Sequence, residues 1–139
     1  MENKNETLTV LDELNKGATM GMEAINFVSE KVKDNDFKGV LKVEYDKYKD
    51  VANKVSELYS HYSEEKPDEA SAFSKAMTWY GIQMKTITDD STSKLSELLM
   101  EGTNMGIIKG RKLINESHSV DSNVKNVLCD FVTMQENSI

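Results

Sequence analysis

Apolar residues recur at alternating spacings of three and four along most of the chain, a pattern typical of amphipathic α-helices that pack against one another. In the first such stretch, residues 7–33, the apolar positions are Leu11, Leu14, Ala18, Gly21, Ile25, Val28 and Val32. In the second, which runs to about residue 62, the seam positions are Phe37, Leu41, Glu44, Tyr48, Val51, Val55, Leu58 and Tyr62. The spacing predicts two long helices joined by a polar turn, in which Asn35 or Asp36 is the expected N-cap.

Three further helical patterns follow. The third covers about residues 67–88, with Pro67 at the first helical position, where proline is favoured. Its inward positions are Ala70, Phe73, Met77, Tyr80, Met84 and Ile87, with Gln83 beside them. The fourth ends near residue 116, follows the cap-forming residues 89–92, and turns inward Leu95, Leu98, Leu99, Gly102, Met105, Gly106 and Leu113. A shorter amphipathic helix then uses Val120, Val124, Val127, Leu128, Phe131 and Met134.

Four long helices with short connections predict an all-α fold, an antiparallel up-down-up-down four-helix bundle over residues 7–117. Residues 1–6 are polar, and we expect them to form a disordered lead-in. Residues 118–139 form the additional, shorter C-terminal helix, whose apolar face must pack on the bundle or on a partner chain. At 139 residues the chain is long enough for one domain with a substantial core.

Two stretches repeat the pattern Gly-x-x-Met-Gly inside predicted helices, with glycines at Gly17 and Gly21 and again at Gly102 and Gly106. Each glycine in a helix interior costs about 0.8–1 kcal/mol relative to alanine, so some compensating contact is expected. Counting residues outward from short loops sets the two pairs at the same height on antiparallel helices. We therefore predict a close backbone contact between the first and fourth helices. Helix breaks and a groove left open for a ligand are the alternatives.

One carboxylate, Glu44, falls on the otherwise apolar seam of the second helix. The same counting places it near Tyr48 and Gln83, whose hydroxyl and amide groups can donate hydrogen bonds to it. Since a buried carboxylate needs donors or must take up a proton, we predict a small buried polar cluster of these three residues. Such a cluster can fix helix register or serve a ligand.

The net charge, the cysteine content and the lack of long apolar runs indicate which partners and which cellular location to expect. The formal net charge is -7, which disfavours a nucleic-acid partner because a phosphate backbone is repelled on average. The single cysteine, Cys129, excludes an intramolecular disulfide and fits a reducing compartment. The polar start of the sequence has no signal-peptide pattern, and no apolar run approaches the roughly 20 residues that span a bilayer. We expect a cytoplasmic protein without a membrane partner.

The layout of four long helices, with a carboxylate midway along the second, resembles the ferritin-like superfamily, in particular its small bacterial bundles of unknown function. Metal-bearing members place a Glu on each of two helices and Glu-x-x-His on the other two. The corresponding positions in this sequence are Glu23, Glu44-x-x-Lys47, Gln83 and Glu101-x-x-Asn104. Both histidines are missing, and Glu23 and Glu101 fall outside the inward stripes, so we expect no di-iron centre.

The sequence contains two histidines, His61 and His118. The bundle layout predicts that both lie at one end of it, near several carboxylates. Two imidazoles with carboxylates can hold Zn²⁺, but neither an i, i+4 histidine pair nor an HExxH motif is present. Histidines exposed to solvent near helix ends are the expected outcome.

The sequence also lacks the Gly-rich phosphate loop and the Gly-x-Ser-x-Gly motif of common enzymes. We assign no catalytic residue and no cofactor, and we expect a non-enzymatic, metal-free bundle with a binding or scaffolding role that self-associates through its C-terminal helix. One alternative is a metal-binding, di-iron oxidoreductase-like or storage protein with a degenerate site, whose weak candidate ligands are Glu23, Glu44, Glu101, His61 and His118. The other is a carrier of a small ligand that binds beside Gly21, Tyr48 and Tyr80.

Overall fold

The computed structural model describes residues 4–63, 81–83, 88–89 and 91–138. Its helices are α1 (Lys4–Lys31), α2 (Asn35–Tyr59), α4 (Thr92–Glu116) and α5 (Ser122–Ser138), and residues 81–83 are helical as well. This part of the chain is all-helical and contains no strand, as the sequence predicted. Most of the predicted third helix, including Tyr80, lies outside the described residues. Within them, no helix combines the length and the apolar character that crossing a membrane requires.

The start of α2 differs slightly from the prediction. The N-cap is Asp34, which precedes both expected residues and has an extended backbone. Its Oδ1 accepts hydrogen bonds from the backbone N–H groups of Asp36 and Phe37, at 2.8 and 3.2 Å. These bonds satisfy two of the donors that the first turn of a helix leaves without partners. A capping residue lies just before the helix, so that its side chain can bond to the backbone of the first turn. Asp34 is the residue in that position.

The apolar seam predicted for the first helix faces the protein interior. All of its side chains are buried except the position without one, Gly21, which is half-buried. The buried members are Leu11, Leu14, Ala18, Ile25, Val28 and Val32. On α2 the same spacing correctly picks out the buried residues Leu41, Tyr48 and Val55. The three-four spacing therefore identified the inward face of both helices.

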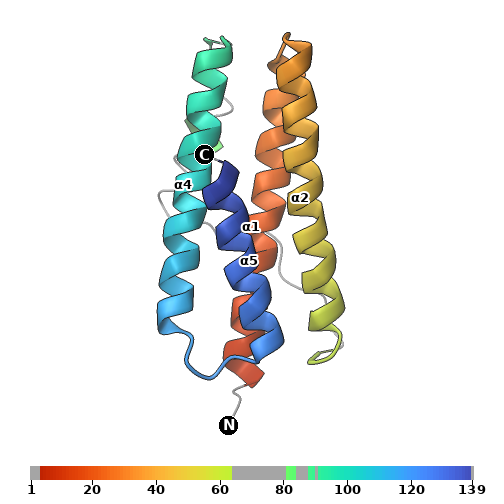
Figure 1. Ribbon diagram of the computed structural model, residues 1–139, viewed down its shortest axis with the longest axis vertical. Coiled ribbons are helices and arrows are strands. Elements are labelled where there is room, and N and C mark those ends of the chain that lie inside the picture. Colours follow the sequence, from red (N-terminus) through yellow and green to blue (C-terminus); the bar gives the residue numbers. More distant parts are fainter. Residues whose placement is uncertain (1–3, 64–80, 84–87, 90, 139) are drawn as a thin grey trace.

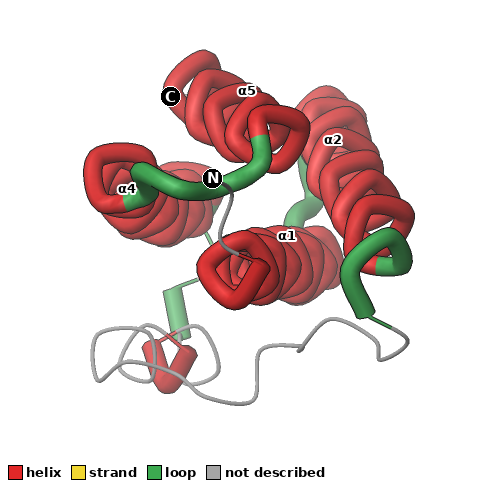
Figure 2. The backbone as a smooth tube through the Cα atoms, turned by 90° about the horizontal axis from the view of Figure 1, so that it is seen from below, coloured by secondary structure: helices red, strands yellow, loops and turns green. Residues whose placement is uncertain are grey.

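The main surprise of the fold is the place of α5. Figure 1 shows two antiparallel hairpins, α1 with α2 and α4 with α5, and the view along the helices in Figure 2 shows α5 as the fourth member of the group. We expected this helix on the outside of a bundle formed by its predecessors, but it packs against α4, α2 and α1. Its buried residues are Val124, Leu128, Phe131, Val132 and Gln135. Of the two packings that the sequence left open, on the bundle or on a partner chain, the structure shows the apolar face of α5 covered within the chain.

Asp121 joins the beginning of α5 to two other helices. Its Oδ1 caps α5 by accepting a hydrogen bond from the backbone of Asn123 at 2.8 Å. Its Oδ2 accepts a hydrogen bond from the hydroxyl of Tyr62, just after α2, and its backbone N–H donates to the hydroxyl of Thr7 in α1. One residue thus holds the start of α1, the end of α2 and the start of α5 together at the lower end of Figure 1.

Three of the four glycines that we predicted to pack against one another, Gly17, Gly21 and Gly106, face large side chains instead. A Cβ atom at Gly21 would lie 2.6 Å from the ring of Tyr48, and one at Gly17 would lie 3.2 Å from the ring of Phe131. On α4, Gly106 faces the amide of Gln135. The reason for the difference is that side chains of α2 and α5 fill the space that we had assigned to a contact between the first and fourth helices.

A first prediction concerns the anchoring of α5. Replacing Asp121 with alanine removes the cap and the acceptor for Tyr62, and loss of an N-cap costs about 1–2 kcal/mol. The Asp121→Ala variant should lose at least that much free energy of unfolding, measured by urea denaturation followed by circular dichroism. Asp130→Ala, an exposed site in the middle of α5, is the control and should unfold like the parent. Equal midpoints for the two variants would contradict the anchoring role.

A second prediction contrasts the effect on stability of alanine substitutions at two glycines, Gly39 and Gly21. A Cβ atom added at Gly39 would have no other atom within 4 Å, so Gly39→Ala should stabilise the protein by up to about 1 kcal/mol through helix propensity. Gly21→Ala forces the Tyr48 ring to move, and overpacking costs about 1–3 kcal/mol, which exceeds that gain. Denaturant titration should therefore give shifts of opposite sign. Stabilisation by both substitutions would show that Tyr48 does not need the space at Gly21.

Candidate functional site

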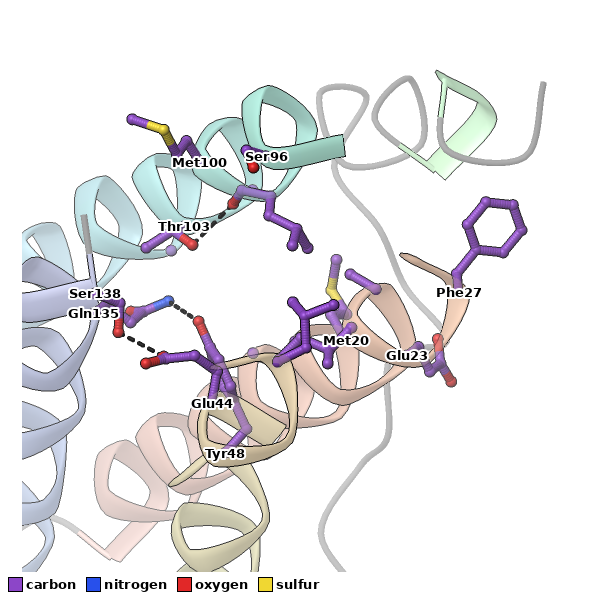
Figure 3. A pocket seen from close by; sticks show the side chains of 18 of the residues that line it. Met20, Glu23, Phe27, Glu44, Tyr48, Ser96, Met100, Thr103, Gln135 and Ser138 are labelled. Atoms are coloured by element: carbon purple, nitrogen blue, oxygen red, sulfur yellow. Dashed lines mark hydrogen bonds between the residues drawn. The ribbon is translucent and has the colours of Figure 1, made fainter. Parts of the chain in front are cut away.

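A cavity of about 620 Å³ lies between α1, α2 and α4. With 17 residues, α5 is shorter than the other three helices, which have 25 to 28, and it ends about halfway up the bundle in Figure 1. The last turn of α5 forms one end of the cavity, which we call the floor, and the cavity continues beyond it between the longer helices (Figure 3). Its volume falls within the range of about 300–1,000 Å³ that is usual for small-molecule sites.

The walls of the cavity are mainly apolar. Contributing side chains are Met20, Ala24, Ile25 and Phe27 from α1, Phe37, Val40 and Leu41 from α2, and Leu99 and Met100 from α4. Gly81 and Ile82 also line it. All four glycines that the sequence analysis singled out, Gly17, Gly21, Gly102 and Gly106, border the same cavity. The missing side chains at Gly21 and Gly106 make room for the Tyr48 ring and the Gln135 amide, which occupy those places.

Several polar groups of the cavity lie on its floor, contributed by α2, α4 and α5, whereas Glu23 and Ser96 line it farther away (Figure 3). Tyr48 is 6% exposed, and its hydroxyl oxygen accepts a hydrogen bond from Nε2 of Gln135 at 3.4 Å. The Glu44 carboxylate accepts one from the Ser138 hydroxyl at 2.6 Å and pairs with Lys47 at 3.1 Å. The Tyr48 ring also meets Phe131 edge to face, with 5.8 Å between the ring centroids. These contacts fix the floor against α2.

One buried polar atom on this floor has no hydrogen-bond partner among the residues that the structure describes. Gln135 is 3% exposed and lines the cavity, and no hydrogen bond from any described residue reaches its side-chain oxygen, Oε1. A buried acceptor without a donor costs about 1–3 kcal/mol, and such groups are uncommon in folded proteins. An unpaired acceptor in the wall of a cavity is the arrangement expected where a bound molecule supplies the donor.

The predicted polar cluster is present in a changed form. The structure brings Glu44 and Tyr48 to one surface, but the amide that bonds to Tyr48 belongs to Gln135 and not to Gln83. Sequence reasoning missed Gln135, although a signal existed. Val124, Leu128, Phe131 and Gln135 follow one another at spacings of four, three and four. Gln135 is therefore a polar residue on an apolar seam, as Glu44 is, and the same reasoning would have selected it.

The weak candidates for metal ligands are not brought together. Glu23 is exposed at the edge of the cavity and Glu44 lies at its floor, whereas Glu101 does not line it. His61 and His118 are both exposed, in the segments that follow α2 and α4 at the lower end of Figure 1. Across the described ranges, no three His, Cys, Asp or Glu side chains are grouped so that they could hold a metal ion.

Burial raises the pKa of the Tyr48 phenol above its ordinary value. Hydrogen bonding with Gln135 and Thr103 lowers the pKa in part, and the negative charge of Glu44 raises it further. The net shift is upward, so Tyr48 is a neutral phenol at physiological pH. The ring and its hydroxyl therefore present an uncharged, hydrogen-bonding surface to the cavity.

Comparison of the chain with family models, with curated proteins and with solved structures gives no match in any of the three. The function must consequently be inferred from the residues of the cavity.

A third prediction follows from the shifted pKa of Tyr48. Because this pKa is higher in the folded state, the unfolded chain loses its phenolic proton first as the pH rises. The stability that the neutral phenol contributes is fully present below about pH 10 and declines above it. In Tyr48→Phe, the free energy of unfolding should therefore fall less steeply above that pH than in the parent. The variant should lose about 0.5–1.5 kcal/mol at neutral pH through the missing hydrogen bond.

Urea titrations at a series of pH values measure both effects. Parallel loss of stability in parent and variant above about pH 10 would contradict the upward shift of the Tyr48 pKa.

Proposed function

We propose that this protein is a non-enzymatic binding protein that holds a small, largely apolar ligand in the cavity between α1, α2 and α4. The observation that carries the proposal is the unpaired Oε1 of Gln135, which is buried in the wall of an otherwise mainly apolar cavity. Apolar walls with a few convergent polar groups are the usual composition of small-molecule sites. Of the roles that the sequence left open, this one makes use of both the glycines and the polar cluster.

Binding is favoured over catalysis by the state of the two reactive groups on the floor. The Glu44 carboxylate is already engaged by Ser138 and Lys47, and the Tyr48 phenol holds its proton because of its raised pKa. General acid–base catalysis needs a group whose pKa lies near the working pH, whereas Tyr48 is shifted away from it. These groups suit the positioning of a ligand better than the transfer of a proton.

The other sequence-based hypotheses have less support. Scaffolding through the C-terminal helix depended on an apolar face that α5 buries against α1, α2 and α4. A degenerate metal site depended on ligands that the described structure leaves apart. The up-down-up-down bundle, the ferritin-like relationship, the homo-oligomer and the cytoplasmic location remain predictions from the sequence.

A fourth prediction tests the cavity as the binding site. The uncharged fluorophore N-phenylnaphthylamine brightens in apolar surroundings and should bind the parent protein with saturation. Ala24 lines the cavity, so Ala24→Phe should fill part of it and weaken binding about tenfold or more, which corresponds to about 1.4 kcal/mol. Ala52→Phe makes the same change on α2 outside the cavity and should leave the affinity unchanged. Circular dichroism of both variants checks that they remain folded.

Absence of saturable binding, or equal weakening by both folded variants, would contradict the proposal. Native mass spectrometry of freshly purified protein complements this test, since a ligand retained from the host appears as a discrete added mass that Ala24→Phe should reduce.

A further inference from the structure

We infer that the cavity takes ligands with a protonated amine as the head group and an apolar body. This inference rests on the proposed function and specifies the chemical class of the ligand. It follows from the floor of the cavity, which is lined by the Glu44 carboxylate of α2 and by Gln135 of α5, whose Oε1 has no donor among the described residues.

The first support is the inventory of acceptors. Gln135 of α5 lines the cavity, and its buried Oε1 has no donor among the described residues; a ligand reaches this atom once the amide turns. Glu44 of α2 offers a carboxylate, whose two oxygens accept about four hydrogen bonds when ionised, and the contacts with Ser138 and Lys47 use part of that capacity. An ammonium group has three donors and no acceptor, so it can bond to the amide oxygen and the carboxylate together. A hydroxyl group can donate only one hydrogen bond.

The second support is the direction of α5. Figure 1 shows that this helix runs upward, and Gln135 and Ser138 of its last turn line the cavity, so its carboxyl end forms the floor. The last four carbonyl groups of a helix lack partners within it, and this end carries about half a negative charge. Ser138 returns one hydrogen bond to the carbonyl of Met134, at 2.9 Å. The remaining negative potential favours a cation at this place and disfavours an anion.

The third support is the balance of charge near Glu44. Lys47 is the cation that pairs with this carboxylate, yet its side chain is 44% exposed against 20% for Glu44. Water screens such a half-exposed pair, which is worth at most about 1 kcal/mol. The carboxylate, which lines the cavity, is therefore only partly neutralised by Lys47. The net charge of -7 adds a weak attraction for cations over the whole molecule.

The apolar walls of the cavity favour a ligand whose body is also apolar. Ala24 and Ile25 of α1, Leu41 of α2 and Leu99 of α4 line the cavity beyond its floor. They offer carbon atoms and no charge. A flexible alkyl chain or a small apolar ring system fits this surface, while a sugar or a nucleotide would leave its polar groups without partners.

The test compares three probes that share one tail and differ only in the head: octylamine, octanol and octanoate. Isothermal titration calorimetry at neutral pH, where the amine is protonated, should rank octylamine tightest, octanol weaker by about tenfold, and octanoate weakest. Glu44→Gln should weaken octylamine about tenfold and leave octanol unchanged. Glu57→Gln, an exposed site on α2 with the same change of charge, is the matched control and should bind all three probes like the parent.

A second variant tests the inference without changing Glu44, whose replacement also alters the contacts with Ser138 and Lys47. Gln135→Met keeps the length of the side chain and its helix propensity but removes the unpaired acceptor. It should reduce the preference for octylamine over octanol, while the Ala24-dependent binding of the uncharged fluorophore persists.

The outcomes distinguish the amine inference from the proposed function. Equal affinity for the three probes, or a preference for octanoate, with binding still blocked by Ala24→Phe, would overturn the amine inference and leave the proposed function standing. Absence of binding by every probe and by the fluorophore would overturn both. A ranking that places octylamine first but does not respond to Glu44→Gln or Gln135→Met would also overturn the inference, because the selectivity would then arise elsewhere.

Discussion

The side chain of Tyr48 is the contact on which the rest of the structure depends. Its ring lies in the space that Gly21 of α1 leaves open, and it meets Phe131 of α5 edge to face. Its hydroxyl group receives a hydrogen bond from Gln135 and is close enough to Thr103 of α4 for that residue to lower its pKa. Four helices thus meet at one aromatic residue, whose ring needs the absent side chain at Gly21 and whose oxygen needs a donor from α5.

This contact also explains why a cavity lies where it does. Below Tyr48, α5 fills the space between the other helices with Val124, Leu128 and Phe131, which are at most 4% exposed. Above it, α5 has ended, and the longer helices enclose a space that no side chain of α5 fills. The boundary between packed core and cavity therefore coincides with the polar groups of the last turn of α5. Polar groups at such a boundary are the ones that a bound molecule can reach.

The sequence predicted the inward faces of α1 and α2 well, because these depend on local spacing. The seam of the first helix and the position of Glu44 and Tyr48 on one face followed directly from the alternation of three and four residues. The same pattern does not say which helix lies opposite a given face. The prediction therefore paired Gly17 and Gly21 with the glycines of the fourth helix, while the structure opposes them with side chains of α2 and α5. The missing information was the order of helices around the core, which long-range packing decides.

The floor of the cavity is the final turn of a helix, and this has a consequence for access. Helix ends fray more readily than helix centres, and local opening of such segments requires much less free energy than global unfolding. The Ser138 hydroxyl, bonded to Glu44, is the tie that closes this turn over α2. A molecule bound at this floor, as we propose, would hold the turn shut, and by linkage a shut turn would retain the molecule more firmly.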